Sequence, residues 1–309
     1  MHRAGQEVAA LDQAAAIPDR PQRRRVLDFA AASLPARIGT TMPPSRPDLP
    51  PNARQLSSPS FRLPALDQDF LLADEQRGVR FMLEYAKAEE ALRRWSVKST
   101  IVVFGSARVR ENGNPRHAAW YAAARAFGRI ASQHGGALNL GAKERENVIA
   151  TGGGPGLMEA ANRGAADIGA PSIGFNIRLP HEQEPNPYST PELTFLFHYF
   201  AMRKMHLAMR ANALVVFPGG FGTLDELFEI LALVQTGKMP RVPVVLFDED
   251  YWRAIVNFEA LADGGMIAEA DLALLKFADT PQEAWERIAS TEGIAPYRTP
   301  VAPGEMGEG

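Results

Sequence analysis

Residues 214–228, LVVFPGGFGTLDELF, join an apolar run to three glycines, a threonine and then acids at helical spacing. Glycine lets backbone amides approach a ligand with no Cβ in the way, and free amides at a helix N-terminus suit a phosphate. The stretch therefore predicts an anion-binding loop made by Gly219, Gly220, Gly222 and Thr223, with Thr223 as the N-cap of the following helix. The alternative is an ordinary tight turn with a capping box.

A second loop of the same kind, TGGGPG, occupies residues 151–156. Two such loops favour anion binding over two unrelated turns. Neither loop is a P-loop, because no lysine stands at the required place, and 152–157 does not give G-x-G-x-x-G in a clean register. These departures argue against NTP hydrolysis and, more weakly, against dinucleotide redox chemistry.

Glu226 lies seven residues beyond Gly219, about one turn into the predicted helix. A carboxylate at this place can act as a base or stabilise positive charge that develops on a sugar. The alternative is a first-turn acid that interacts only with the helix dipole. The same two interpretations apply to Asp225 and Glu229, which are weaker candidates for the catalytic carboxylate.

Arg203 and Lys204 interrupt a stretch, residues 194–213, that is otherwise mainly apolar and aromatic. A helix that is apolar on most faces is buried, and a buried cation needs a partner. Arg203 is therefore predicted to pair with Glu226 or with a ligand phosphate, unless its long side chain reaches the surface.

No metal site or other cofactor is expected. His198 and His206 stand too far apart on a helix to form a metal set and are interpreted as packed or capping residues. The chain has no cysteine, which excludes disulfides, thiolate nucleophiles and cysteine metal sites.

Length and composition indicate one large domain with appendages. The chain has 309 residues, of which 46% are hydrophobic, and a formal net charge of -3. This balance favours neither a nucleic-acid partner nor a membrane surface, and no apolar run approaches the ~20 residues of a membrane helix. The N-terminus lacks the apolar core of a secretory signal, so we predict a cytoplasmic protein.

The elements that must position these residues alternate between strand and helix. Strands are expected within 99–104, 146–151, 171–179, 214–217 and 241–248. Helices are expected within 67–95, 115–136, 157–169, 194–213, 221–235, 250–265 and 281–290, with a weakly patterned segment before the last one.

This alternation predicts an α/β, Rossmann-like, doubly wound fold: a mainly parallel sheet with helices on both faces. Ligands of such folds lie outside the carboxyl ends of the strands. Three glycine-marked strand ends should therefore face one crevice, at Gly105-Ser106, Gly152–Gly154 and Gly219–Gly222.

The predicted domain organisation has four parts. Residues 1–64 form a disordered Pro/Arg-rich arm, 65–96 a helical extension, 97–295 the catalytic domain and 296–309 a flexible tail. The arm carries ten of the 24 prolines: Pro18, Pro21, Pro35, Pro43, Pro44, Pro47, Pro50, Pro51, Pro59 and Pro64. Its cluster Arg23–Arg25 is interpreted as a solvated patch rather than a polyanion site.

The motifs resemble those of a known family. PGGFGTLDE fits the GGxGTxxE motif of the Lonely guy (LOG) family, and AMRKMHLAMR matches the arginine-lysine helix that precedes it. ATGGGPGLMEAANRGA and VFGSAR match the other glycine loops of that family. The resemblance covers about residues 97–290, and NIRLPHEQEPNPY with the N-terminal extension is similar to the longer bacterial members.

The resemblance implies a phosphoribohydrolase that cleaves the N-glycosidic bond of AMP or an N6-substituted AMP, a cytokinin precursor. It implies Arg203 and Glu226 as the catalytic pair and a minimal dimer with active sites near its interface. Met202 stands where short members often carry a glutamate, a departure that concerns the base. Besides the loop 219–223, the implied substrate contacts are Gly105, Ser106, Gly153, Gly154, Met158, Glu159, Met202 and Lys204.

Three alternatives stay open at this point. A nucleotide or molybdenum-cofactor carrier of the same fold would bind without catalysis, although retention of both Arg203 and Glu226 favours an enzyme. A PLP-dependent decarboxylase, the label that this family often receives, needs a Schiff-base lysine, and only Lys204 and Lys238 lie near the glycine loops. The N-terminal arm could also act in assembly or partner binding.

Overall fold

Seven strands form one sheet in the order β4-β3-β2-β1-β5-β6-β7, and every neighbouring pair is parallel. The computed structural model describes residues 50–139, 144–179 and 184–291. The strands are β1 (Thr100–Phe104), β2 (Val148–Thr151), β3 (Ser172–Ile177), β4 (Thr194–Phe197), β5 (Ala211–Val216), β6 (Val244–Phe247) and β7 (Leu275–Ala278). The predicted α/β fold with a parallel sheet is confirmed.

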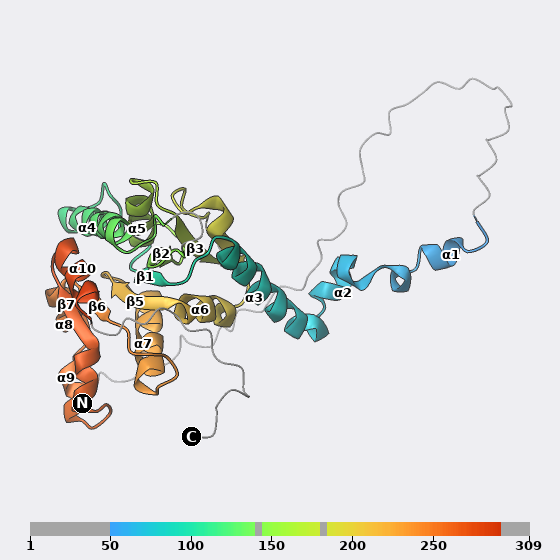
Figure 1. The fold of residues 1–309 in the computed structure, drawn as a ribbon. Helices are drawn as coiled ribbons and strands as arrows, with labels where there is room; N and C mark the ends of the chain where they lie inside the picture. The colour runs from blue at the N-terminus through green and yellow to red at the C-terminus, as the bar shows by residue number, and fades with distance from the viewer. Residues whose placement is uncertain (1–49, 140–143, 180–183, 292–309) are drawn as a thin grey trace, which may run out of the picture. The chain divides into compact units, whose positions relative to one another are not determined.

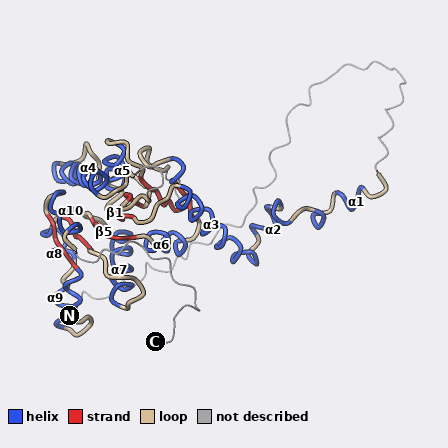
Figure 2. The backbone as a smooth tube through the Cα atoms, in the orientation of Figure 1, coloured by secondary structure: helices blue, strands red, loops and turns tan. Residues whose placement is uncertain are grey.

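Helices cover both faces of the sheet. Figure 1 shows α4 and α5 together on one side of the strands and α6 and α7 on the other, and Figure 2 shows the strands between these helices. The longer helices are α3 (Arg77–Arg94), α4 (Pro115–His134), α5 (Leu157–Ala166), α6 (Phe200–Met209), α7 (Phe221–Gln235), α8 (Glu249–Ile255), α9 (Phe258–Asp263) and α10 (Pro281–Ala289). The doubly wound architecture follows from this arrangement.

Continuous apolar runs make the central strands. All residues of β1, β2, β5 and β6 are buried, as a parallel strand covered on both faces requires. Local signals set the helix ends: Asn114 caps α4 by accepting a hydrogen bond from the His117 amide, and Pro115 follows at the first helical position.

The predicted helix over 194–213 is wrong at both ends. Residues 194–197 form the edge strand β4, in which Phe195 and Phe197 are buried and Leu196 is exposed, and residues 211–213 begin β5. In the sequence, the alternation of TFLF cannot be told from the longer apolar and aromatic stretch that contains it. Pairing with β3 makes these residues a strand, because a strand gains its hydrogen bonds only from a neighbouring strand.

The opposite edge strand was not predicted either. β7 occupies the weakly patterned segment before α10, and its first three residues are only partly buried. An edge position leaves part of the strand open to solvent, which weakens the apolar signal in the sequence.

The predicted single helix over 67–95 is divided. A short helix, α2 (Gln68–Leu72), is capped by Asp67, Ala73 is extended, and a turn at Asp74–Gln76 leads into α3. Part of the extension thus forms turns, whereas α3 is continuous.

Among the described residues, no helix combines the length and apolar character needed to cross a bilayer.

Residues up to Phe61 form a separate unit. Its described part contains a short helix, α1 (Ala53–Leu56), and a turn at Pro59–Phe61, neither with a buried residue. The rest of the predicted arm, with Arg23–Arg25, and the predicted tail 296–309 lie outside the described residues.

Candidate active site at the carboxyl ends of three central strands

The three glycine-marked loops follow strands that are neighbours in the sheet, β2, β1 and β5. The strand order reverses here: β2, β3 and β4 extend the sheet on one side of β1, and β5, β6 and β7 extend it on the other. Ser106 joins the loops, because its amide donates to the Pro218 carbonyl at 3.0 Å and its carbonyl accepts from the Leu157 amide at 3.1 Å. The loops therefore share one crevice at the topological switch point, where doubly wound folds bind ligands.

A buried ion pair lies at this crevice. Arg203 of α6 donates from Nη2 to Glu226 Oε1 of α7 at 2.7 Å, and the two residues are 8% and 3% exposed. The structure thus brings the two candidate catalytic residues together and excludes a surface position for Arg203.

Arg203 also contacts the loop after β2. A Cβ placed on Gly152 would lie 3.2 Å from Arg203 Nη1 and 2.9 Å from Met158 Sδ. A side chain at position 152 would therefore overlap Met158 and crowd Arg203, so glycine is required there. The Arg203–Glu226 pair links the two glycine loops, because Arg203 contacts the loop after β2 and Glu226 belongs to α7, the helix that follows the loop after β5.

Burial dominates the electrostatics of the pair. It raises the pKa of Glu226 to about 7, while attraction to Arg203 and Lys204 acts in the opposite direction. Burial also lowers the pKa of Arg203, although an arginine stays protonated. Within the described part of the chain, Arg203 Nε is buried without a hydrogen-bond partner. The site can thus supply a carboxyl group that titrates near neutrality and a buried cation with a spare donor.

The loop after β5 exposes backbone at the start of α7. The predicted N-cap Thr223 is wrong: Gly220 is the N-cap, and its carbonyl accepts from the amides of Thr223 and Leu224 at 2.9 Å each. The earlier amides, of Phe221 and Gly222, precede the first intrahelical bond. Cβ atoms on Gly220 and Gly222 would meet nothing within 4 Å, so this loop is open to a ligand.

Thr223 instead packs under the loop. It is buried, and its Oγ1 lies 2.1 Å from the place of a Cβ on Gly219. Any side chain at Gly219 would collide with it. Gly219 serves close packing, whereas Gly220 and Gly222 leave space for a ligand.

The loop after β2 is closely packed by comparison. Gly153 has φ +69°, and a Cβ there would lie 2.4 Å from the buried Asn176 amide. Gly156, with φ +77°, precedes α5 and packs against the Ser106 carbonyl. Only glycine combines these backbone angles with such close contacts.

Asn186 holds this loop from behind. It is 5% exposed, and its Nδ2 donates to the carbonyls of Gly153 at 3.1 Å and Gly154 at 3.3 Å. The same nitrogen also donates to Asn162 Oδ1 at 3.0 Å, which accepts from Thr151 Oγ1 at 2.7 Å. The loop is thus part of a buried amide network.

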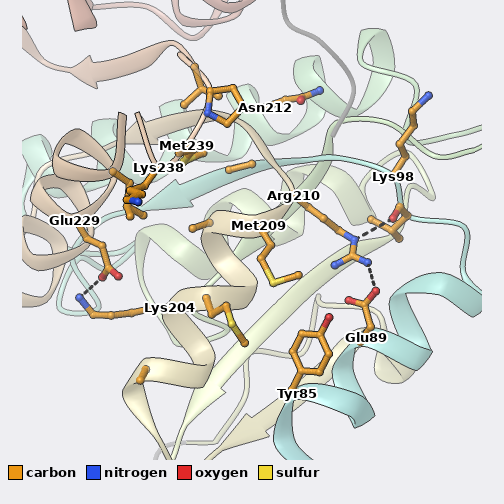
Figure 3. Close-up of a pocket in the computed structure, with 18 of the residues that line it drawn as sticks. Tyr85, Glu89, Lys98, Lys204, Met209, Arg210, Asn212, Glu229, Lys238 and Met239 are labelled. Atoms are coloured by element: carbon orange, nitrogen blue, oxygen red, sulfur yellow. Dashed lines mark hydrogen bonds and ion pairs between the residues drawn. The ribbon is translucent and has the colours of Figure 1, made fainter. Parts of the chain in front are cut away.

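Two residues predicted to contact the substrate, Lys204 and Glu159, bond to other side chains of the protein instead. Lys204 pairs with Asp225 at 2.9 Å and with Glu229, in a groove of about 1660 Å³ that neither Arg203 nor Glu226 lines. Figure 3 shows Lys204 directed toward Glu229 in this groove. Glu159 accepts from Tyr121 Oη at 2.7 Å beside a second cavity of about 420 Å³. Met202 is half-buried against the core.

Histidines and acids form no metal cluster in the described ranges, where no group of three or more such ligands converges. His206 is buried, stacked on Tyr85 and Phe175, and burial lowers its pKa to about 4. It is a packed histidine, as its spacing suggested.

Sequence reasoning missed three residues that shape the loops: Asn176, which fills the space beside Gly153, and Asn186 and Tyr251, which donate to glycine carbonyls. Tyr251 donates from its hydroxyl to the Gly219 carbonyl at 2.8 Å. Asn176 and Asn186 both lie in the segment NIRLPHEQEPNPY, whose resemblance to the longer family members is the one signal that pointed to them. Nothing local marks Tyr251, 32 residues from Gly219.

Comparisons with known proteins agree with the motifs. The family model described as "Possible lysine decarboxylase" matches residues 158–288. The rice (Oryza sativa subsp. japonica) protein named probable cytokinin riboside 5′-monophosphate phosphoribohydrolase LOGL3 is 28% identical over 167 residues, which are 51% of this chain and 74% of that protein.

One solved structure with a similar trace is the molybdenum cofactor binding protein of the phototrophic bacterium Rippkaea orientalis. Its TM-score is 0.42 at 21% identity, and the match covers 62% of this chain and 96% of that one. This likeness is too distant to carry a ligand over to this chain.

A second rice relative is more similar in sequence. The protein named probable cytokinin riboside 5′-monophosphate phosphoribohydrolase LOG4 is 31% identical over 166 residues, which are 52% of this chain and 70% of that protein. The resemblance seen in the glycine loops and the arginine-lysine helix is thereby confirmed, and this chain belongs to the Lonely guy (LOG) family.

Proposed function

We propose that this protein hydrolyses the N-glycosidic bond of AMP or of an N6-substituted AMP, releasing the free base and ribose 5-phosphate. The buried Arg203–Glu226 pair at the crevice where the glycine loops meet carries this proposal. Relatives named as phosphoribohydrolases of cytokinin riboside 5′-monophosphates support the reaction class.

In the proposed mechanism the open loop after β5 holds the 5′-phosphate. The amides at Gly220 and Gly222 and the positive end of α7 attract the anion. Fixing the phosphate orients the ribose and uses binding energy remote from the reacting carbon.

Glu226 then acts on the reacting carbon. As the bond from C1′ to the base nitrogen breaks, its electron pair leaves with the base, and the ionised carboxylate stabilises the positive charge on the sugar. Water adds its oxygen to C1′; its proton passes to the Glu226 carboxylate and on to the departing base. Arg203 holds the carboxylate in place at 2.7 Å.

Chromatography of the products tests the proposal. Purified protein is incubated with AMP and with N6-isopentenyl-AMP, and released base is measured beside Glu226→Gln. We expect base from the wild type and a rate lower by roughly 10²–10³-fold in the variant. Measurable AMP binding without any base release would instead support a non-catalytic nucleotide carrier.

The lysine chemistry suggested by the family model's description fits these residues poorly. Burial acts to lower the pKa of Lys204, but hydrogen bonds to Glu229 and Asp225 outweigh it, so the pKa is raised. A Schiff-base lysine must lose its proton, which this ion pairing opposes. An absorbance near 420 nm in purified protein would contradict this view.

We further propose a cytoplasmic homodimer or larger homo-oligomer, as the resemblance implies, with 97–295 as the catalytic domain and 65–96 as its extension. Light scattering of the full chain, and of a chain that lacks residues 1–64, tests the assembly and the role of the arm. A monomeric, fully active protein would contradict it.

A further inference from the structure

The short helix α8 supports the loop after β5 from outside the crevice. It starts two residues beyond β6, and Tyr251 in its first turn donates from Oη to the Gly219 carbonyl at 2.8 Å. The next residue, Trp252, is fully buried and donates from Nε1 to the Val216 carbonyl at 3.2 Å. One helix thus holds both the last residue of β5 and the glycine loop after it.

The bond to Gly219 has a consequence for the next amide. A trans peptide is planar, and its C=O and N–H point in opposite directions. Tyr251 holds the Gly219 carbonyl on the side of α8, so the Gly220 N–H of the same peptide points away from α8. Gly220 is exposed, and a Cβ there would meet nothing within 4 Å, so a ligand has room beside this peptide.

Asp248 fixes the start of α8. It is a non-glycine residue with φ +72°, a conformation that costs energy and persists only where its surroundings enforce it. Its Oδ1 accepts from the Tyr251 amide at 2.9 Å, and its Oδ2 accepts from Trp120 Nε1 at 2.7 Å and from Arg116 at 3.3 Å. The Trp120 ring meets the Tyr251 ring edge to face, with centroids 5.6 Å apart.

From these contacts we propose that Tyr251 is a positioning residue for the phosphate subsite, itself held by Asp248 and Trp120. The assignment rests on the proposed function, because it takes the loop after β5 as the place of the 5′-phosphate. Tyr251 acts through the Gly219–Gly220 peptide and orients an amide for the anion.

Tyr251→Phe tests the proposal, because it removes one hydroxyl and keeps the ring packed. Steady-state kinetics with AMP gives KM and kcat, and calorimetry gives the Kd of ribose 5-phosphate. We expect KM and Kd to rise together by roughly 3- to 10-fold, the worth of one hydrogen bond, with kcat within about twofold. A loss of kcat at unchanged KM and Kd, or no change in any of the three, would overturn it.

A matched control is Tyr85→Phe, which removes a hydroxyl from a ring stacked on His206. It should leave the KM for AMP and the Kd of ribose 5-phosphate within about twofold of the wild-type values. Asp248→Asn is a second probe: asparagine also tolerates positive φ, but its amide nitrogen cannot accept from Trp120. We expect the same pair of constants to rise, and an unchanged Kd in both variants would reject the assignment.

Calorimetry separates this inference from the proposed function. If the wild type releases no base from any nucleotide yet binds ribose 5-phosphate, the hydrolase is rejected, while the effect of Tyr251→Phe on Kd still decides the role of Tyr251. If the wild type does not bind ribose 5-phosphate, the phosphate subsite and the role of Tyr251 are both rejected.

Discussion

The glycine loops after β2 and after β5 face one crevice but are built in opposite ways. The loop at 152–156 has two glycines at positive φ, Gly153 crowded by Asn176 and Gly156 by Ser106, and a buried amide holds two of its carbonyls. The loop at 218–222 leaves Gly220 and Gly222 uncrowded and is held at Gly219 by one phenol. The first loop has a rigid shape, and the second presents open backbone.

Both loops nevertheless share one device. A residue from a later segment holds a glycine carbonyl, Asn186 at Gly153 through its backbone and side-chain amides and Tyr251 at Gly219 through its hydroxyl, so that the amide of the next glycine points the other way. Rich glycine content alone would leave these peptides free to rotate. The hydrogen bonds from Asn186 and Tyr251, more than the glycines themselves, therefore orient the loop amides.

The pair between the loops should give the largest effect, seen as a pH dependence. Because the pKa of Glu226 in the free protein is raised to about 7 and the ionised form is needed, kcat/KM should fall by about tenfold per pH unit below 7 and level off above it. The AMP phosphate titrates near pH 6 and adds its own fall only below that pH, so the step between pH 6 and 8 is the one that reports Glu226. A flat kcat/KM from pH 6 to 8 would contradict the role of Glu226.

Gly153→Ala and Gly220→Ala compare the two loops directly. Gly153→Ala combines positive φ with overlap onto Asn176 and should lower the free energy of unfolding by about 2–4 kcal/mol. Gly220→Ala has room, at φ −98°, and should change unfolding by less than about 1 kcal/mol while raising KM. Denaturant unfolding and kinetics would measure both, and equal stability losses would remove the contrast.

Asn186→Ala tests the support of the loop after β2. It removes the side-chain donor to the Gly153 and Gly154 carbonyls, of which Gly153 keeps the bond from the Asn186 backbone amide at 2.9 Å; the loss should cost about 1–3 kcal/mol of stability and raise KM.

The matched control is Asn257→Ala, which removes the cap of α9 and should cost about 1 kcal/mol. We expect its KM to stay unchanged. If both variants leave KM alone, Asn186 has only a structural role.

The smallest effect is expected from support outside both loops. Glu84 of α3 accepts from the amides of His198 at 2.9 Å and Tyr199 at 3.2 Å, and so fixes the two residues that precede α6, the helix that carries Arg203. Glu84→Gln should cost about 0.5–1 kcal/mol and lower kcat a few-fold. Glu90→Gln on the same helix, which loses only a surface pair with Arg94, is the control and should change neither quantity.

Local patterns in the sequence were enough for the sheet class, the three glycine-marked strand ends and the candidates Arg203 and Glu226. β-branched runs, helix periodicity and glycine clusters act over a few residues, so they are readable without a partner. The edge strands β4 and β7 were missed because half-exposed strands show only a weak pattern and depend on a neighbour for their hydrogen bonds.

The folded chain alone reveals how the site is held. The sequence left Arg203 between a buried pair and the surface, and placed Thr223 at a cap that Gly220 occupies. Asn186 and Tyr251 contact glycines about 30 residues away, through hydrogen bonds that depend on where each helix and loop packs. Such contacts leave no period or composition in the chain, because they are set by the distance and angle between two atoms rather than by neighbours in sequence.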